Sequence, residues 1–132
     1  MKVLVDTCIW SLVFRRQTKP VAERKILTDL ILNQRVAMIG PIRQELLSGI
    51  RDENVFAKLK EHMSAFPDIQ LQTIDYERAA ELSNAFHKKG IQSSAVDALI
   101  CSVAIGHQLK IFTTDKDFLR YQKIVPIKVM GC

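Results

Sequence analysis

The sequence predicts one α/β domain over residues 1–132, in which a short parallel sheet is flanked by helices. First, short apolar runs alternate with longer amphipathic segments, which is the order of strands and helices in a parallel sheet. Second, a helix-length run at 95–105 is apolar on almost every side, so it belongs at the centre of a domain. Third, no repeat, low-complexity segment or linker marks a second domain.

Short apolar runs, several rich in β-branched residues, are predicted to form the strands of the sheet. The run at 69–74 alternates with polar residues, which is typical of a strand at the edge of a sheet. The run at 110–112 is short and apolar enough to be buried. The expected strands are 2–5, 36–39, 69–74, 110–112 and 124–129.

The predicted helices are indicated by apolar spacing and by residues that start or stop helices. Pro20 and Pro41 suit a first helical turn, and Asp75 suits the start of the helix that follows it. Lys88 and Lys89 followed by Gly90 are typical of a helix C-terminus. The expected helices are 8–14, 21–33, 42–50, 52–66, 75–89 and 95–105, with a basic loop at 15–20.

The composition is that of an ordinary globular chain, with 48% hydrophobic and 25% charged residues. The net charge of +5 favours a polyanionic partner. Cys8, Cys101 and Cys132 are dispersed, which is typical of free thiols in a reducing compartment. Without a signal peptide or an apolar run long enough to span a membrane, we expect a cytoplasmic protein.

Acidic side chains occur where the predicted strands end and where the following helices begin. Such positions meet at one edge of a parallel sheet, where ligands bind. Each acid also has a local explanation, as a helix cap, as a partner of the helix dipole or as a turn residue. For example, Ser94 and Asp97 have the spacing of a capping box. The acids expected to converge are Asp6, Glu45, Asp97, Asp115 and Asp117.

Carboxylates without histidine or cysteine ligands suit Mg²⁺ or Mn²⁺ rather than zinc. Such ions orient an attacking water and stabilise the charge that develops on a phosphoryl group. No serine–histidine or cysteine–histidine arrangement competes, since His62, His87 and His107 lie on predicted helix surfaces or ends. The acids therefore predict a metal site.

Four motifs, in order along the chain, resemble those of the PIN-domain family, specifically its VapC-type toxins of bacterial toxin–antitoxin pairs. They are Val3-Leu4-Val5-Asp6-Thr7, Gln44-Glu45-Leu46-Leu47-Ser48-Gly49, Ser94-Ala95-Val96-Asp97-Ala98-Leu99-Ile100 and Thr113-Thr114-Asp115-Lys116-Asp117-Phe118. Each motif is weak alone, whereas the ordered set spans nearly the whole chain.

The resemblance implies a Mg²⁺-dependent endoribonuclease, the toxin of a type II pair. It also implies a homodimer, an antitoxin whose C-terminal segment occupies the active-site groove, and an RNA substrate such as tRNA. Asp117 would be an accessory acid, and the Thr113 hydroxyl would orient water or a ligand. Cys8 departs from the family, which often has Asn or Ser there. The implied acidic site is Asp6, Glu45, Asp97 and Asp115.

Two other classes of function are alternatives to a nuclease. One is a catalytically inactive PIN-fold domain that binds RNA or a partner; missing acids would favour it, and none is missing. The other is a phosphoacceptor, which needs further acids near Asp6, where Cys8 stands instead.

Two groups of surface residues are candidates for contact with a substrate or partner. Trp10 and Phe14 form an apolar face that either packs against a neighbouring helix or docks a partner. The candidates for contact with an RNA backbone, each also explained as a solvated surface residue, are Arg15, Arg16, Lys19, Arg43, Lys116 and Arg120.

Overall fold

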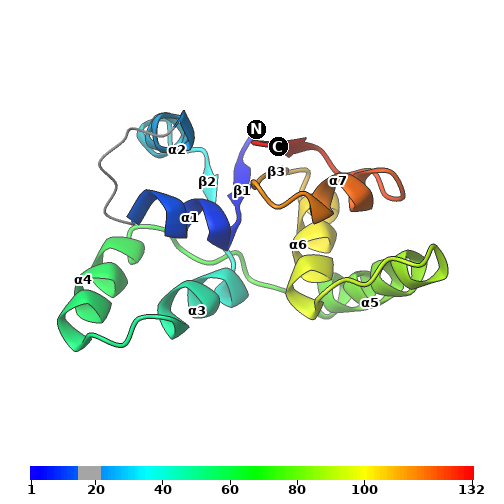
Figure 1. Cartoon of the computed structure of the whole chain (residues 1–132), viewed down its shortest axis with the longest axis horizontal. Coiled ribbons are helices and arrows are strands. Elements are labelled where there is room, and N and C mark those ends of the chain that lie inside the picture. Colours follow the sequence, from blue (N-terminus) through cyan, green and yellow to red (C-terminus); the bar gives the residue numbers. More distant parts are fainter. Residues whose placement is uncertain (15–21) are drawn as a thin grey trace.

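A computed structural model describes residues 1–14 and 22–132. Four parallel strands form one sheet in the order β2-β1-β3-β4. In Figure 1, helices α1 to α4 lie on one side of β1 and helices α5 to α7 on the other. The strands are β1 (Val3–Val5), β2 (Val36–Ala37), β3 (Lys110–Phe112) and β4 (Val129–Met130). The α/β architecture predicted from the sequence is confirmed.

The helices follow the strands in the predicted order, with one addition near the C-terminus. Their bounds are α1 (Thr7–Phe14), α2 (Ala22–Leu32), α3 (Gly40–Ser48), α4 (Glu53–Met63), α5 (Thr73–Lys88), α6 (Ala95–Gly106) and α7 (Asp117–Gln122). The helix α7 was not predicted from the sequence. Among the described residues, no helix is long and apolar enough to cross a membrane.

The centre of the fold is formed by β1, β3 and α6. All residues of β1 are 0% exposed, and α6 is buried from Ala98 to Ala104. Burial of each large apolar side chain stabilises the fold by about 1.5–3 kcal/mol, so the uninterrupted apolar run fixes α6 in the core. The predicted central position of this helix is confirmed.

Two of the predicted strands are wrong. The segment 69–74 contributes only a single bridge, in which the Ile69 amide donates to the Met38 carbonyl at 2.8 Å. Instead, Gln72 and Asp75 form a capping box that starts α5 at Thr73. In the segment 124–129, the ladder begins only at Val129. Pro126 lacks an amide hydrogen and cannot donate to a ladder.

The predicted docking role of Trp10 is also wrong, because its side chain is internal. Trp10 is 1% exposed and its indole N–H donates to the Val5 carbonyl at 3.2 Å. Its ring stacks on Phe14 and meets Phe66 at a centroid distance of 5.2 Å. Phe14 remains 44% exposed. The packing alternative therefore holds for Trp10.

Candidate metal-binding site

The parallel pairing of β1 and β3 brings Asp6 and Thr113 together at the C-terminal edge of the sheet. Val5 pairs with Phe112, and the Asp6 amide donates to the Phe112 carbonyl at 2.9 Å. The Thr113 hydroxyl donates to Asp6 Oδ2 at 2.8 Å and accepts from the Asp115 amide at 3.0 Å. Thr113 is fully buried. The Thr113 hydroxyl therefore fixes both Asp6 and the loop that carries Asp115 and Asp117.

Asp6 combines a position at the start of α1 with one in an acidic cleft. Its Oδ1 accepts from the amide of Thr7, the first residue of α1, at 2.8 Å, rather than from the second or third helical amide as a capping side chain does; the Asp6 carbonyl accepts from the Ile9 amide at 3.1 Å. Burial raises the pKa of Asp6, against the lowering effect of hydrogen bonds from Thr113 and Thr7, and the charge of Glu45 raises it further. Asp6 thus occupies the start of α1 and is also part of the acidic cleft.

Asp97 lies in the first turn of α6 and is held at both its backbone and its side chain. The Asp97 amide donates to Ser94 Oγ at 3.0 Å, so the predicted cap is present. The Asp97 carboxylate accepts from the Tyr121 hydroxyl at 2.9 Å. Burial, opposed by the Tyr121 hydrogen bond and assisted by the charges of Asp6 and Asp115, raises the pKa of Asp97 to about 6.

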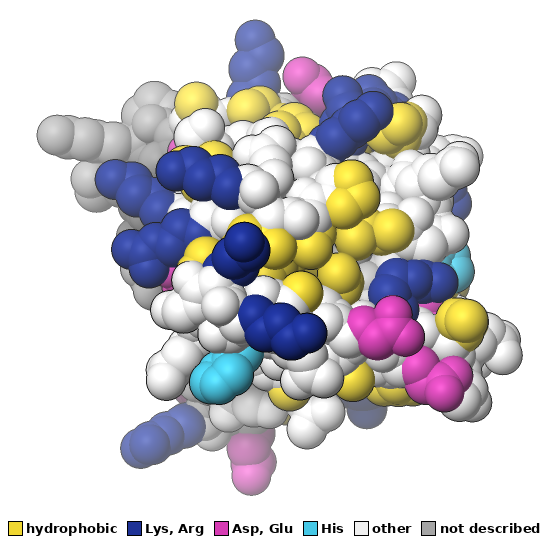
Figure 2. Space-filling view, turned by 90° about the vertical axis from the view of Figure 1, so that its right-hand side faces the viewer, with side chains coloured by type: hydrophobic (Ala, Val, Ile, Leu, Met, Phe, Trp, Pro, Cys, Tyr) yellow, Lys and Arg dark blue, Asp and Glu magenta, His cyan; other side chains and the backbone are white. Residues whose placement is uncertain are grey.

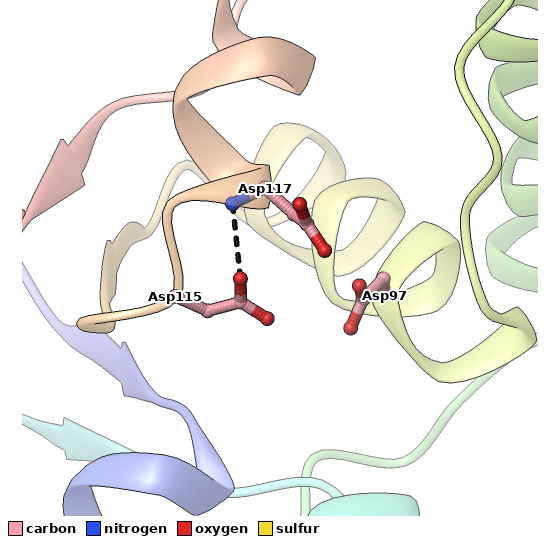
Figure 3. A group of neighbouring side chains, drawn as sticks. All are labelled: Asp97, Asp115 and Asp117. Carbon is pink, nitrogen blue, oxygen red and sulfur yellow. Dashed lines mark hydrogen bonds between the residues drawn. The ribbon is translucent and has the colours of Figure 1, made fainter.

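Asp97, Asp115 and Asp117 form the tightest group of acids, shown in Figure 3. One carboxylate oxygen from each lies within 4.8 Å of the others. The Asp117 amide donates to Asp115 Oδ1 at 2.9 Å, which orients that carboxylate. The carboxylates come from two elements, α6 and the turn that starts α7, and they face a common space.

A cleft of about 460 Å³ joins this group to the sheet edge. Glu45 enters the cleft from α3, where its side chain is exposed. Asp117 does not line the cleft but lies at its border, with its carboxylate beside Asp97 and Asp115. The lining residues are Asp6, Thr7, Cys8, Ser11, Leu12, Glu45, Asp97, Thr114 and Asp115.

The donor set of the cleft fits a hard divalent cation. Mg²⁺ and Mn²⁺ prefer carboxylate oxygens, and Mg²⁺ keeps several of its waters. Burial is the main cause of the raised pKa values of Asp6 and Asp97, and repulsion from neighbouring acids adds to it; a bound cation would relieve that repulsion. No histidine lines the cleft among the described residues. Asp97, Asp115 and Asp117 are the acids close enough together to share such an ion, and Asp6 and Glu45 line the same cleft.

Cys8 contacts the Thr113 hydroxyl, which also donates to Asp6. Its Sγ lies 3.3 Å from Thr113 Oγ1 and 3.6 Å from Asp6 Oδ2. The Thr114 amide also donates to Cys8 Sγ, at 3.5 Å. Cys8 is therefore part of the cleft wall and contacts the groups that position Asp6.

Tyr121 is a site residue that the sequence analysis missed. Its side chain is 1% exposed, stacks on Phe86 at a centroid distance of 4.6 Å and meets Phe118 edge to face. The signal in the sequence is the position of Tyr121 four residues after Asp117, in a segment for which no helix was predicted. In a helix, Asp117 and Tyr121 are neighbours on successive turns.

The basic candidates for contact with a substrate differ in their surroundings. Arg43 is engaged internally: its guanidinium donates to Asp68 and to the carbonyls of Met63 and Phe66, which ties α3 to the end of α4. Lys116 and Arg120 are exposed at α7. Arg15, Arg16 and Lys19 lie outside the described residues.

Comparison with known proteins agrees with this fold. The PIN-domain family model matches residues 3–124. A VapC ribonuclease of Mycobacterium bovis is 32% identical over 120 residues, covering 88% of each chain, and ribonuclease VapC11 of Mycobacterium tuberculosis matches equally.

Among solved structures, VapBC2 from Rickettsia felis bound to a promoter DNA fragment superposes with a TM-score of 0.79. The match covers 98% of both chains at 20% identity, which is a likeness of fold. The chain therefore belongs to the PIN-domain family and, within it, to the VapC branch.

Proposed function

We propose that the protein is a Mg²⁺-dependent endoribonuclease that acts as the toxin of a type II toxin–antitoxin pair. The observation that carries the proposal is the convergence of Asp6, Glu45, Asp97 and Asp115 on one cleft, with Asp117 at its border. The ribonuclease names of the 32% identical mycobacterial relatives support the same activity.

In the proposed reaction, water attacks a phosphorus atom of the RNA backbone and one phosphorus–oxygen bond breaks. A divalent cation, when bound, lowers the pKa of that water and stabilises the charge that develops on the phosphoryl group. Asp97, Asp115 and Asp117 would hold the cation, and Asp6 and Glu45 would complete the acidic surroundings. The Thr113 hydroxyl fixes Asp6 and the Asp115 amide, so the acids need little rearrangement on binding.

The partners follow from the same family membership. We infer a cognate antitoxin, since one solved neighbour is a VapBC complex and another is a toxin–antitoxin complex from Klebsiella pneumoniae. The active form is a homodimer, and the substrate is structured RNA such as tRNA. The protein acts in the cytoplasm, which agrees with the free thiols of Cys8, Cys101 and Cys132.

The proposal is tested by incubating purified, antitoxin-free protein with total RNA in millimolar Mg²⁺ or Mn²⁺. We expect cleavage that stops on addition of EDTA and that Asp97→Asn abolishes. Asp29→Asn, on the exposed surface of α2, makes the same charge change and serves as the control. Undiminished cleavage in excess chelator would exclude the metal mechanism. A folded, monodisperse protein that binds RNA but never cleaves it would favour the inactive binding domain.

A further inference from the structure

Three basic residues line one side of α7, beginning at the acidic cluster. Lys116, Arg120 and Lys123 are spaced i, i+4 and i+7, and the backbone is helical at both Lys116 and Lys123. All three are exposed, and the Arg120 side chain is 69% exposed. Phe118 and Tyr121 occupy the opposite, buried side. At 1.5 Å per residue, the stripe extends about 10 Å away from the cluster.

The end of α5 carries two further cations. The stacking of Phe86 on Tyr121 places the C-terminal end of α5 against α7. Lys88 and Lys89 lie two and three residues after Phe86, at the end of α5, and are exposed. In Figure 2, which views the side of the molecule formed by these elements, Lys and Arg side chains gather over much of the face. The acidic side chains visible there are fewer and lie toward the lower right, the top and the bottom of the view.

Helix capping explains only part of this pattern. Cations near a helix C-terminus are stabilised by the helix dipole, which accounts for Lys88, Lys89, Arg120 and Lys123. Lys116, however, lies at the N-terminal end of α7, where the dipole disfavours a cation. Arg120 has one acidic neighbour within ion-pair distance among the described residues, Asp117 at 3.9 Å, and both side chains are largely exposed. Such a pair contributes little to stability.

We propose that this surface, the α7 track, binds the phosphate backbone of the RNA substrate beside the acidic cleft. The α7 track is Lys116, Arg120 and Lys123. The inference rests on the proposed nuclease function and assigns a substrate-binding surface to it. An acidic cleft repels a polyanion before a metal binds, and cations adjoining the cleft offset that repulsion. An acidic protein is the other class of partner that the surface suits, but the continuity of the track with the cleft favours the substrate.

The test compares two triple variants that remove the same charge. The track variant is Lys116→Gln, Arg120→Gln and Lys123→Gln. The control variant is Lys25→Gln, Lys58→Gln and Lys60→Gln, exposed residues of α2 and α4, which lie on the other side of β1 in Figure 1. The probe is a fluorescein-labelled tRNA transcript, whose binding is followed by anisotropy in EDTA from 50 to 300 mM KCl.

We expect the track variant to lower the slope of log affinity against log salt by about 2, at roughly 0.7 per lost phosphate contact to a single strand. The corresponding loss of affinity at 0.1 M salt is on the order of 100-fold, and the control variant changes much less. Melting curves verify folding. If the triple variant does not fold, Lys116→Gln and Arg120→Gln are measured singly, each with an expected slope change of about 0.7.

The outcomes separate this inference from the proposed function. Equal losses of tRNA affinity in the track and control variants, or an unchanged slope in the track variant, overturn the inference. In that case, RNA cleavage by the wild type still supports the nuclease function. A wild-type protein that neither binds nor cleaves RNA overturns both. Loss of tRNA binding confined to the track variant supports the α7 track.

Discussion

Replacement of Asp97 by asparagine is expected to stabilise the metal-free protein at neutral pH. The pKa of Asp97 rises from 3.8 to about 6 in the folded state, so the folded state holds this proton more tightly than the unfolded state does. Stability therefore falls as pH rises from about 4 to 6, and the full penalty is present above pH 6.

The size of the effect follows from the same shift. A difference of about 2 pKa units corresponds to about 3 kcal/mol at 1.36 kcal/mol per unit, and solvent at the cleft reduces this to about 1–3 kcal/mol. For a domain of this size, the melting temperature should rise by roughly 4–10 °C. Asparagine can still accept the Tyr121 hydroxyl, and the Ser94 cap uses the backbone, so neither contact is lost.

The assay is thermal unfolding in EDTA at pH 7.5 and at pH 4, with Asp29→Asn as the control for loss of a surface charge. The stabilisation should be present at pH 7.5 and largely gone at pH 4. Mg²⁺ should raise the melting temperature of the wild type more than that of the variant, because it binds the folded state through this carboxylate. If Asp97 were only a helix N-terminal acid, the variant would be destabilised by roughly 0.3–1 kcal/mol. A lower melting temperature at pH 7.5, with a wild type indifferent to Mg²⁺, would refute the reasoning.

Three further substitutions test the surroundings of the site. Tyr121→Phe should weaken Mn²⁺ affinity by roughly 10–100-fold, as is typical when a group that orients a metal ligand is lost. Tyr76→Phe, at an exposed position, is the control and should leave the affinity unchanged. Calorimetric titration with Mn²⁺ measures both. Thr113→Val removes a buried hydroxyl that makes hydrogen bonds on both sides, and should cost about 1–3 kcal/mol in urea unfolding, while an unchanged midpoint would contradict the role given to it. Arg43→Gln should lower stability by a similar amount but leave the salt dependence of tRNA binding unchanged, because its donors are used internally; a lower slope would show that it contacts the substrate.

Much of the fold follows from local sequence. The uninterrupted apolar run of α6 requires a central position, and the apolar strands β1 and β3 require burial. Given a parallel sheet, Asp6 and Asp115 had to approach each other, since each follows a strand that ends at the same edge. The position of the acidic cleft is thus a consequence of the pattern of strands and helices.

The features that sequence reasoning missed depend on contacts between distant residues or on competing local signals. At 69–74 the alternation resembles a strand, but the capping box at Gln72 starts a helix before a ladder can form. Trp10 turns inward because Phe66, far along the chain, covers its ring. The Tyr121–Asp97 hydrogen bond requires α7 to pack against α6. The local spacing of apolar residues does not predict this contact.

The most direct test of the acidic cleft is anomalous diffraction from crystals soaked in Mn²⁺. We expect a peak in the cleft with carboxylate oxygens of Asp97 and Asp115 as direct ligands and with water completing the coordination. The peak should be absent from crystals of Asp97→Asn prepared in the same way. A cleft without a peak at Mn²⁺ concentrations that support RNA cleavage, or an ion held elsewhere on the molecule alone, would contradict the assignment of these acids as the metal-binding site.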